Sequence, residues 1–379
     1  MVKYINFCNE KISQLGFGLM RLPVKDNDQS KVDYEKTEEM FLYAVEHGIN
    51  YFDTAFPYHN GFSEIMLGNM VENNHMRSKV NIATKLFTLG MEKPDYDPVK
   101  MFETQLKRLK TDHIEFYLIH GLHGEQWNTL KRKFNIENFL NEMRANGTIR
   151  HMGFSFHDDY DRFVNILDDY DWEFAQIQYN YLDNDIQAGD KGIAYAVSKN
   201  IPLNVMEPLK GGNLSFCDYP RIREILDKNG LSGMSGAELA FRYVFDKKGL
   251  GVVLSGMSEL SQLRENIDIV ERCDEGNLKE NEMKAIEQIR EFLSEIETIP
   301  CTGCRYCVEE CPEKIKIPTA FSLYNNGIKF SNKQAQMRGY DRDCANISNC
   351  RECLACEEAC PQHLEIPELL KKVREYFGN

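Results

Sequence analysis

The stretch GFGLMRLP at residues 16–23 decides between two ways of folding the first 270 residues. A doubly wound parallel sheet would need a G-x-G-x-x-G turn after its first strand, and these residues do not contain one. The alternative is a barrel of eight strand and helix units, which takes about 250 residues. GFGLMRLP therefore favours the barrel, and the following residues must supply the remaining units.

Short apolar runs alternate with helical patterns up to residue 270. Strands that are apolar throughout are typical of a parallel sheet, because both of its faces are covered. We therefore predict a (β/α)8 TIM barrel over residues 1–270, with helices at stretches such as 33–47, 98–110, 137–146 and 259–270. The predicted strands are 15–20, 49–55, 80–86, 114–122, 149–156, 174–180, 201–208 and 250–257.

The cysteines gather at the other end of the chain. Nine of the twelve lie between residues 301 and 360, and eight of these form two runs, CTGCRYCVEECP (301–312) and CRECLACEEACP (350–361). Each run spaces its cysteines by two, two and three residues and ends in proline, which is the spacing of cluster-binding runs in bacterial ferredoxins. A pair of zinc sites is the alternative, but zinc gives no reason for the third cysteine and the trailing Cys-Pro. The runs predict two 4Fe–4S clusters.

Residues 300–370 resemble two-cluster bacterial ferredoxins, including a repeat of CPEKIKIP (311–318) in CPQHLEIP (360–367). The resemblance implies that three cysteines of each run bind one cluster and the fourth binds the other. We therefore expect a small α+β domain over 300–379, with a helix and a long loop between the runs and Cys344 as a bystander. An amphipathic helix in 271–299 joins the two domains. The expected ligand sets are Cys301, Cys304, Cys307 and Cys360 for one cluster and Cys350, Cys353, Cys356 and Cys311 for the other.

Four polar side chains follow neighbouring predicted strands of the barrel, at the end where barrel enzymes have their active sites. They are Asp53 and Tyr58 after the second strand, Lys85 near the end of the third and His120 at the end of the fourth. An ammonium lowers the pKa of a neighbouring phenol, and a carboxylate holds the ammonium in place. With an imidazole to orient a carbonyl, the four groups can donate a proton to a developing alkoxide.

The barrel resembles the aldo-keto reductase family in the segments FDTAFPYHNGFSEIMLG (52–68), ATKL (83–86) and LIHGL (118–122). The resemblance implies that Tyr58 is the general acid, that Lys85 and Asp53 tune it, and that His120 orients the carbonyl of the substrate. A barrel joined to a two-cluster tail resembles the iron–sulfur subgroup of this family.

The same resemblance implies a nicotinamide cofactor, NADPH or NADH. Four positions depart from the family: Phe156 replaces a carboxamide-binding asparagine, Met206 replaces an aromatic residue, and Gly256 and Gln262 replace cations that bind the 2′-phosphate. A flavin is therefore an alternative cofactor. The implied cofactor-binding residues are Ser155, Gln176, Leu209, Gly211, Ser255, Gln262, Glu265 and Asn266.

The net charge of -14 argues against binding to nucleic acid, which needs a basic surface. No run approaches 18 apolar residues, and the first residues do not read as a signal peptide, so we expect a cytoplasmic protein without a membrane segment. Three functions fit the sequence. The first is a carbonyl reductase whose clusters either take electrons from a ferredoxin or flavodoxin or serve structure and docking. The second is a flavin-bridged reductase that depends on ferredoxin, and the third is an electron-transfer or redox-sensing protein that uses the barrel as a scaffold.

Overall fold

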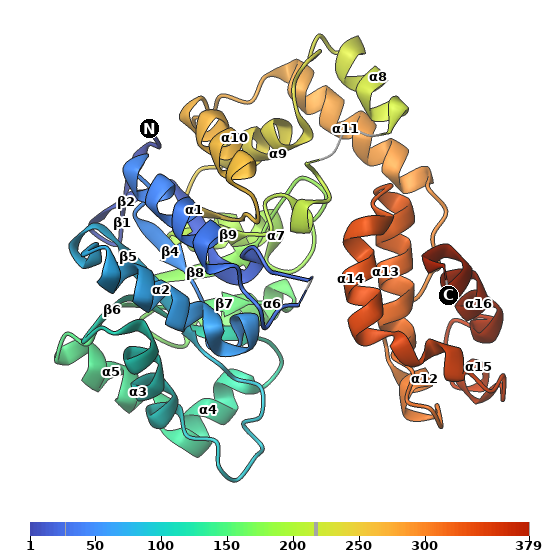
Figure 1. Cartoon of the computed structure of the whole chain (residues 1–379), viewed down its shortest axis with the longest axis horizontal. Helices are drawn as coiled ribbons and strands as arrows, with labels where there is room; N and C mark the ends of the chain where they lie inside the picture. Colours follow the sequence, from blue (N-terminus) through green and yellow to red (C-terminus); the bar gives the residue numbers. More distant parts are fainter. Residues whose placement is uncertain (27, 216–218, 379) are drawn as a thin grey trace. The chain divides into compact units, whose positions relative to one another are not determined.

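The computed structural model describes residues 1–26, 28–215 and 219–378. The chain packs as two compact units (Figure 1). One unit consists of Met1–Ser215 and Met234–Glu280, and the other consists of Phe216–Gly233 and Asn281–Asn379. The sequence predicts a barrel domain that ends at residue 270 and a cluster domain that begins at residue 300. These boundaries stay a prediction about which parts fold separately.

The first unit is a closed barrel of eight parallel strands, in which the last strand pairs with the first. This confirms the predicted (β/α)8 barrel. Each strand begins and ends within about three residues of its predicted position. The strands are β3 (Leu15–Gly18), β4 (Tyr51–Asp53), β5 (Asn81–Leu86), β6 (Ile114–Leu122), β7 (Ile149–Phe156), β8 (Phe174–Gln178), β9 (Leu203–Met206) and β10 (Leu250–Gly256).

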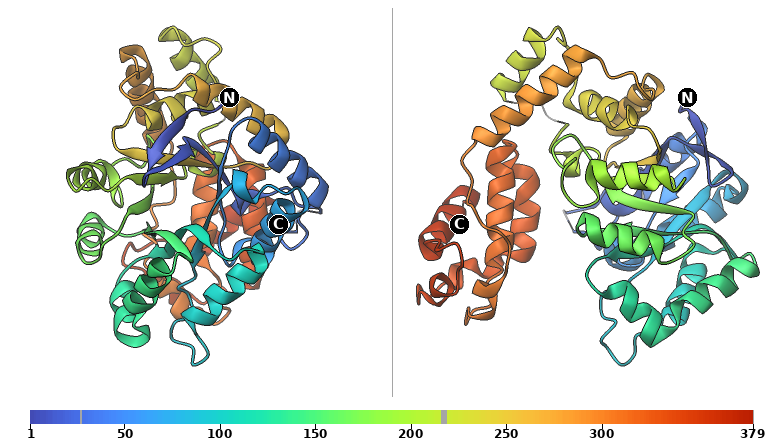
Figure 2. Two further views of the ribbon diagram at one scale, coloured as in Figure 1. Left: turned by 90° about the vertical axis from the view of Figure 1, so that its left-hand side faces the viewer. Right: turned by 180° about the vertical axis from the view of Figure 1, so that it is seen from behind.

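Helices surround these strands, as the two views of Figure 2 show. Aspartate or serine side chains begin several of them by accepting a hydrogen bond from the backbone of the first turn, which satisfies a free N–H group. These N-cap residues are Asp33, Asp97, Asp159 and Ser235. The helices are α1 (Tyr34–Glu46), α2 (Phe62–Asn73), α3 (Pro98–Leu109), α4 (Gln126–Phe134), α5 (Ile136–Ala145), α6 (Tyr160–Asp168), α7 (Gly189–Ser198), α9 (Gly236–Phe245) and α10 (Leu260–Glu271).

A β-hairpin of β1 (Tyr4–Phe7) and β2 (Glu10–Ser13) closes the amino-terminal end of the barrel. Phe7 is 1% exposed, and its ring lies 5.5 Å from the rings of both Phe116 and Phe174 inside the barrel. Because this end is filled by side chains, the carboxyl ends of the strands form the open rim. The sequence analysis missed the hairpin, since its four-residue strands and its Cys8–Asn9 turn carry no glycine signal.

The second unit is built from helices in the described residues. Helices α13 (Ile317–Lys329) and α14 (Lys333–Asp343) lie between the two cysteine runs, so the spacer forms a helical hairpin in place of the expected helix and loop. The segments after the runs, 312–316 and 361–365, are turns and unpaired backbone, and thus the β part expected for this domain is not formed there. The other elements are α8 (Pro220–Lys228), α11 (Glu280–Glu295), α12 (Tyr306–Glu309), the 3-10 helix η5 (Ala345–Asn349), α15 (Ala355–Glu358) and α16 (Ile366–Phe377).

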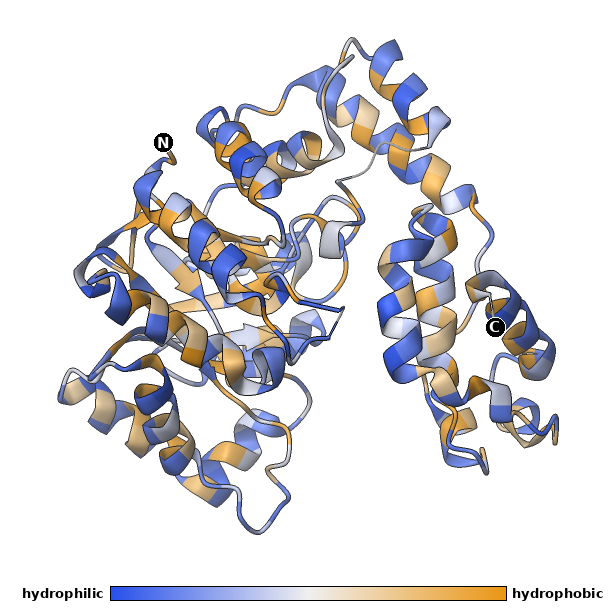
Figure 3. Cartoon of the chain, viewed as in Figure 1, coloured by the Kyte–Doolittle hydropathy of each residue, from blue (hydrophilic) through white to orange (hydrophobic). Residues whose placement is uncertain are grey.

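Helix α11 is the amphipathic helix that the sequence predicts, with Ile286, Ile289 and Leu293 buried. Hydrophobic and hydrophilic residues alternate along it in Figure 3. Helix α8 packs against it although α8 comes from the connection between β9 and α9. The rings of Tyr219 and Phe292 lie 5.4 Å apart in this contact. No helix in the described ranges has the length and apolar character needed to span a bilayer.

Candidate functional site

Lys85 and Asp53 form a buried ion pair at the open rim of the barrel. The Lys85 ammonium, which is fully buried, donates to both carboxylate oxygens of Asp53 at 2.7 Å and to the carbonyl of Thr54 at 2.8 Å. Burial lowers the pKa of Lys85, but Asp53 and Tyr58 together outweigh burial and the net direction is upward. Lys85 is therefore a fixed positive charge inside the rim.

Tyr58 lies beside this charge, with its ring centroid 5.1 Å from the Lys85 nitrogen. It begins a short 3-10 turn, η2 (Tyr58–Gly61), in which His59 and Asn60 have positive φ angles of 50° and 56°. The turn is held by His59, whose Nε2 accepts a hydrogen bond from the backbone N–H of Leu22 at 3.1 Å. Tyr58 is thus positioned by a strained turn that a second loop fixes.

The pKa of Tyr58 is raised above its usual value, because burial of the phenol is a larger effect than the Lys85 charge, which lowers it. The sequence-based expectation that Lys85 lowers the pKa of Tyr58 is correct for that charge, but it did not include burial, which reverses the net direction. Burial was not visible in the spacing of the four residues. The consequence is that Tyr58 carries its proton at neutral pH.

His120 completes the group, with its ring 5.9 Å from that of Tyr58 and at 80° to it. Burial and the positive charges of Lys85 and His157 lower the pKa of His120 to about 3, so the imidazole is neutral. Its Nδ1 is buried without a hydrogen-bond partner in the protein. The structure therefore brings together all four residues that the sequence singled out.

We expect this neutral histidine to make the barrel less stable in mild acid. The unfolded chain takes up a proton on His120 below about pH 6.5, whereas the folded chain does so only near pH 3. Between these values the unfolded state binds more protons, so stability falls as the pH decreases. From pH 7 to pH 5 the wild type should lose about 2 kcal/mol more than His120→Gln does, as measured by urea unfolding at the two pH values.

An equal pH dependence in both proteins would show that His120 is not held neutral. Both tryptophans of the chain, Trp127 and Trp172, belong to the barrel, and their fluorescence reports its unfolding.

A second buried charge supports the strand that carries Lys85. Glu64 on α2 is 0% exposed; it pairs with Arg108 at 3.1 Å and accepts hydrogen bonds from Thr84 and Gln105 at 2.7 Å. Gln105 in turn donates to the backbone carbonyl of Lys85 at 3.0 Å. Sequence reasoning missed this network; the only signal was a charged residue on a face of α2 that is otherwise small or apolar.

Removing this carboxylate should destabilise the barrel strongly. We expect Glu64→Ala to lower the free energy of unfolding by about 3 kcal/mol, since Arg108 and the buried amide of Gln105 lose their partner. The matched control is Glu72→Ala on the same helix, where an exposed carboxylate pairs with Lys110 and contributes about 0.5 kcal/mol or less. Urea unfolding followed by tryptophan fluorescence compares the two variants, and equal losses would contradict the role of Glu64.

Ser155 and Gln176 lie side by side on the next part of the rim, where they pair in register between β7 and β8. They are 1% and 2% exposed. Gln176 donates to the sulfur of Met206 at 3.7 Å, and its own Oε1 is buried without a partner in the protein. An amide that offers an N–H group would satisfy this oxygen, so the pair fits the carboxamide of a nicotinamide. Phe156, which departs from the asparagine of the family, is fully buried.

The segment after β9 forms a tight turn that contains Leu209 and Gly211. Gly211 has a φ of 66°, and the turn is anchored by Lys210, which pairs with the buried carboxylate of Asp183 at 2.6 Å. Glu207 at the start of the segment pairs with Arg21 at 3.4 Å. The loop that the sequence assigns to the pyrophosphate is therefore held by two side chains from other loops of the barrel, Asp183 and Arg21.

The end of β10 and the start of α10 hold the last four predicted residues. Asn266 donates to the hydroxyl of Ser255 at 3.1 Å, and both are buried. Gln262 accepts the backbone N–H of Ser258 at 2.9 Å, while Glu265 is exposed. Ser255, Gln262 and Asn266 thus shape the turn between strand and helix, while Gln262 and Glu265 are both exposed.

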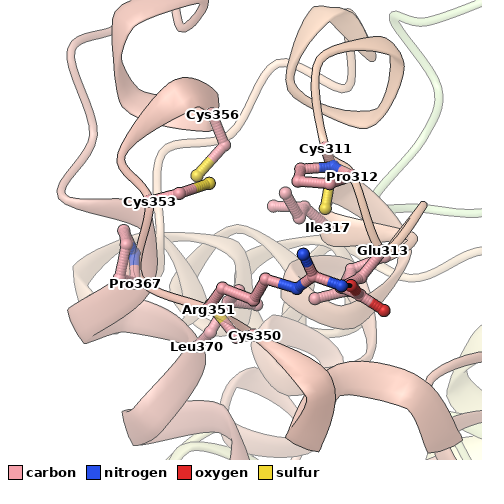
Figure 4. A pocket seen from close by; sticks show the side chains of 11 residues that line it. Cys311, Pro312, Glu313, Ile317, Cys350, Arg351, Cys353, Cys356, Pro367 and Leu370 are labelled. Carbon is pink, nitrogen blue, oxygen red and sulfur yellow. Dashed lines mark ion pairs between the residues drawn. The ribbon is translucent and has the colours of Figure 1, made fainter.

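In the second unit, the eight predicted cysteines line two separate cavities, and they divide between the cavities as the sequence predicts. The Cys301 cavity is lined by Cys301, Cys304, Cys307 and Cys360. The Cys350 cavity is lined by Cys311, Cys350, Cys353 and Cys356 (Figure 4). Cys344 lines neither cavity and is buried in the core of the unit.

These cavities fit iron–sulfur clusters better than single zinc ions. A zinc ion needs four ligands that meet at one point and no cavity between them. Here four cysteines surround a space whose other walls are largely apolar, with Ile317 shared by both cavities. No three His, Cys, Asp or Glu side chains in the described ranges are arranged around a single ion. The donor set and the lining are suited to a cluster, and the assignment of the eight cysteines as its ligands stays a prediction.

The comparisons with known proteins agree with both halves of the chain. Residues 14–291 match the sequence model of the aldo/keto reductase family. The chain belongs to the aldo/keto reductase family. Residues 300–364 of this aldo/keto reductase match the model of a 4Fe–4S dicluster domain, so the reductase barrel is followed by a ferredoxin-type domain.

Relatives of this aldo/keto reductase include the uncharacterized oxidoreductase YqkF of Bacillus subtilis, which is 26% identical over 310 residues that cover 73% of the chain and 92% of the relative. L-galactose dehydrogenase of Arabidopsis thaliana is 26% identical over 315 residues, covering 76% and 91%. Among solved structures, an aldo-keto reductase from Bacillus halodurans in its holo form has a TM-score of 0.61 at 22% identity, covering 76% and 96%. The protein is an oxidoreductase of this family.

Proposed function

We propose that the barrel reduces the carbonyl group of a small molecule with hydride from a nicotinamide cofactor, and that Tyr58 donates the proton. The second unit would hold two 4Fe–4S clusters that exchange single electrons. The observation that carries the proposal is the buried Lys85 ammonium, fixed by Asp53 and facing the ring of Tyr58. A scaffold would have no use for a desolvated charge beside a phenol, because burying it costs free energy.

The protein's own groups account for the proton transfer. The raised pKa of Tyr58 keeps its proton in place until a substrate oxygen becomes negative. Lys85 then stabilises the phenolate that remains. Neutral His120 would donate a hydrogen bond to the substrate carbonyl and so orient it. Its Nδ1, which has no hydrogen-bond partner in the protein, would be free to bond a ligand. When bound, the nicotinamide supplies the hydride.

The cofactor would lie along the rim from β7 to β10. Gln176 and Ser155 would bind its carboxamide, the turn with Leu209 and Gly211 its pyrophosphate, and Ser255 with the start of α10 its adenosine. An aldo-keto reductase from Klebsiella pneumoniae has been solved in complex with NADPH, at 17% identity and a TM-score of 0.59, covering 76% of this chain and 95% of that one. Gly256 and Gln262 bring no cation to the 2′-phosphate, so we propose that NADH and NADPH are both accepted.

The two clusters would be bound by three cysteines of one run and the fourth of the other, as the two cavities divide them. Their electron carrier would be of the ferredoxin or flavodoxin class, in the reducing cytoplasm. Nicotinamide transfers two electrons together, whereas clusters transfer them one at a time. Electrons would therefore pass between the two only through a group that takes part in both two-electron and one-electron transfer.

The test is an anaerobic titration of the purified protein, which should contain about eight irons per chain. With an aromatic aldehyde, NADPH absorbance should fall in proportion to aldehyde consumed. Stoichiometric flavin in the isolated protein would favour the flavin-bridged alternative, and absence of turnover with a panel of aldehydes and ketones despite NADPH binding would favour the scaffold. Bleaching of the clusters by NADPH alone would show that hydride and one-electron chemistry are connected.

A further inference from the structure

The two cluster cavities are built from repeated segments, but they differ in charge at three matched positions where at least one of the two residues lines a cavity. Thr302, Gln362 and Arg305 line the Cys301 cavity. Their counterparts in the repeat are Arg351, Glu313 and Leu354, of which Arg351 and Glu313 line the Cys350 cavity. The sequence repeat therefore places two different sets of side chains around otherwise equivalent cysteines.

The charges at the Cys350 cavity cancel each other. Arg351 and Glu313 form an ion pair at 2.5 Å across its wall, drawn in Figure 4. Leu354, the third matched position, carries no charge and is 50% exposed. The cysteines of this cavity therefore face no net charge from these positions.

The Cys301 cavity keeps an uncompensated cation. Arg305 stands between Cys304 and Cys307 with a φ of 71°, in the same left-handed conformation as Leu354, whose φ is 64°. None of the ion pairs found among the described residues includes Arg305. Thr302 and Gln362 add a hydroxyl and an amide, which are hydrogen-bond donors for cluster sulfurs.

Reduction adds one negative charge to a cluster, so nearby cations and hydrogen-bond donors favour the reduced form and anions oppose it. We propose that Arg305 makes the cluster of the Cys301 cavity the first to be reduced; this inference rests on the two-cluster assignment above. One electron passes from a one-electron reductant, which is oxidised, to this cluster, and no bond is broken.

The order of reduction is an equilibrium property, because the two clusters can exchange the electron. Ile317, which is 1% exposed, lines both cavities, so a single side chain forms a shared wall. The electron therefore settles on the cluster with the higher reduction potential, whichever cluster the reductant meets first.

The experiment is an anaerobic redox titration with dithionite, followed by electron paramagnetic resonance. The wild type should be reduced in two steps. The two proteins are compared at the potential where the first step of the wild type is half complete. At that potential, Arg305→Gln should have a ratio of reduced to oxidised first cluster that is about threefold to tenfold lower. The reason is that an exposed charge at this distance changes this ratio by about a factor of ten or less. The second step should not move.

Two matched variants make the assignment specific. Arg351→Gln leaves Glu313 unpaired and should lower only the reduction potential of the second step. Leu354→Arg places a cation at the position matching Arg305 and should raise only the reduction potential of the second step. The potentials of the two steps should therefore lie closer together. Leu354→Arg also keeps the proposal testable if Arg305→Gln fails to fold, because the backbone at 354 has the conformation that an arginine adopts at 305.

A shift of the second step in Arg305→Gln, or no shift in either step, would overturn the proposal, as would a shift of the first step in Leu354→Arg. Iron analysis separates this failure from that of the proposed function. Wild-type protein without iron refutes the clusters themselves, whereas eight irons with the wrong order of reduction refutes only the role of Arg305.

Discussion

Tyr58→Phe is expected to lower kcat/KM for carbonyl reduction by about 10²- to 10⁴-fold, the usual contribution of a positioned general acid. The substitution removes one oxygen and keeps the ring that faces Lys85. Because Lys85 stays paired with Asp53, the rim should keep its shape and the dissociation constant of NADPH should change little. Steady-state kinetics with an aldehyde, together with fluorescence titration of NADPH, measure both quantities.

A matched control is Tyr195→Phe on the outer helix α7. It removes a phenol hydroxyl that donates a hydrogen bond to Asp168 at the surface. It should leave kcat/KM unchanged, and both variants should keep their iron. If Tyr58→Phe retained more than about a tenth of the wild-type kcat/KM, another group would have to be the acid.

Cys311→Ser is expected to remove about four of the eight irons, and those irons should come from the cluster of the second run. Cys311 belongs to the first run in the sequence, but it lines the Cys350 cavity together with Cys350, Cys353 and Cys356. Loss of its thiolate leaves three ligands there, whereas the Cys301 cavity keeps all four of its own. Iron analysis and electron paramagnetic resonance of the reduced protein should then show one cluster without a magnetic neighbour.

Cys344→Ser is the matched control, because Cys344 is buried in the same unit but lines neither cavity. It should keep about eight irons and the spectrum of two interacting clusters. Full iron content in Cys311→Ser would contradict the exchange of ligands between the runs.

The features predicted correctly from sequence were those with a strong local signal. Continuous apolar runs located the eight barrel strands, since buried parallel strands need no polar face. Cysteine spacing also predicted which four cysteines line each of the two cavities, because each run fixes how its thiolates are presented. Asp53, Lys85 and His120 could be placed at one rim because parallel strands end on the same side of a barrel.

What the sequence did not show depends on distant residues. The network of Glu64, Gln105 and Arg108 joins α2 to α3, and nothing in either helix alone indicates that they meet. The direction of the Tyr58 pKa depends on burial, which results from several loops at once. Phe7 fills the barrel from a hairpin too short to have a clear pattern.

The origin of helix α8 affects how the chain can fold during synthesis. Ile222, Ile225 and Leu226 are buried in the finished protein, and α8 packs with α11, which begins at Glu280. At a translation rate of about 5–20 residues per second, α8 leaves the ribosome several seconds before α11 does. During that interval its apolar face is uncovered while the barrel is still being completed. Nascent chains should therefore expose this face to chaperones, and any shortened gene that stops before α11 would leave it exposed for the lifetime of the protein.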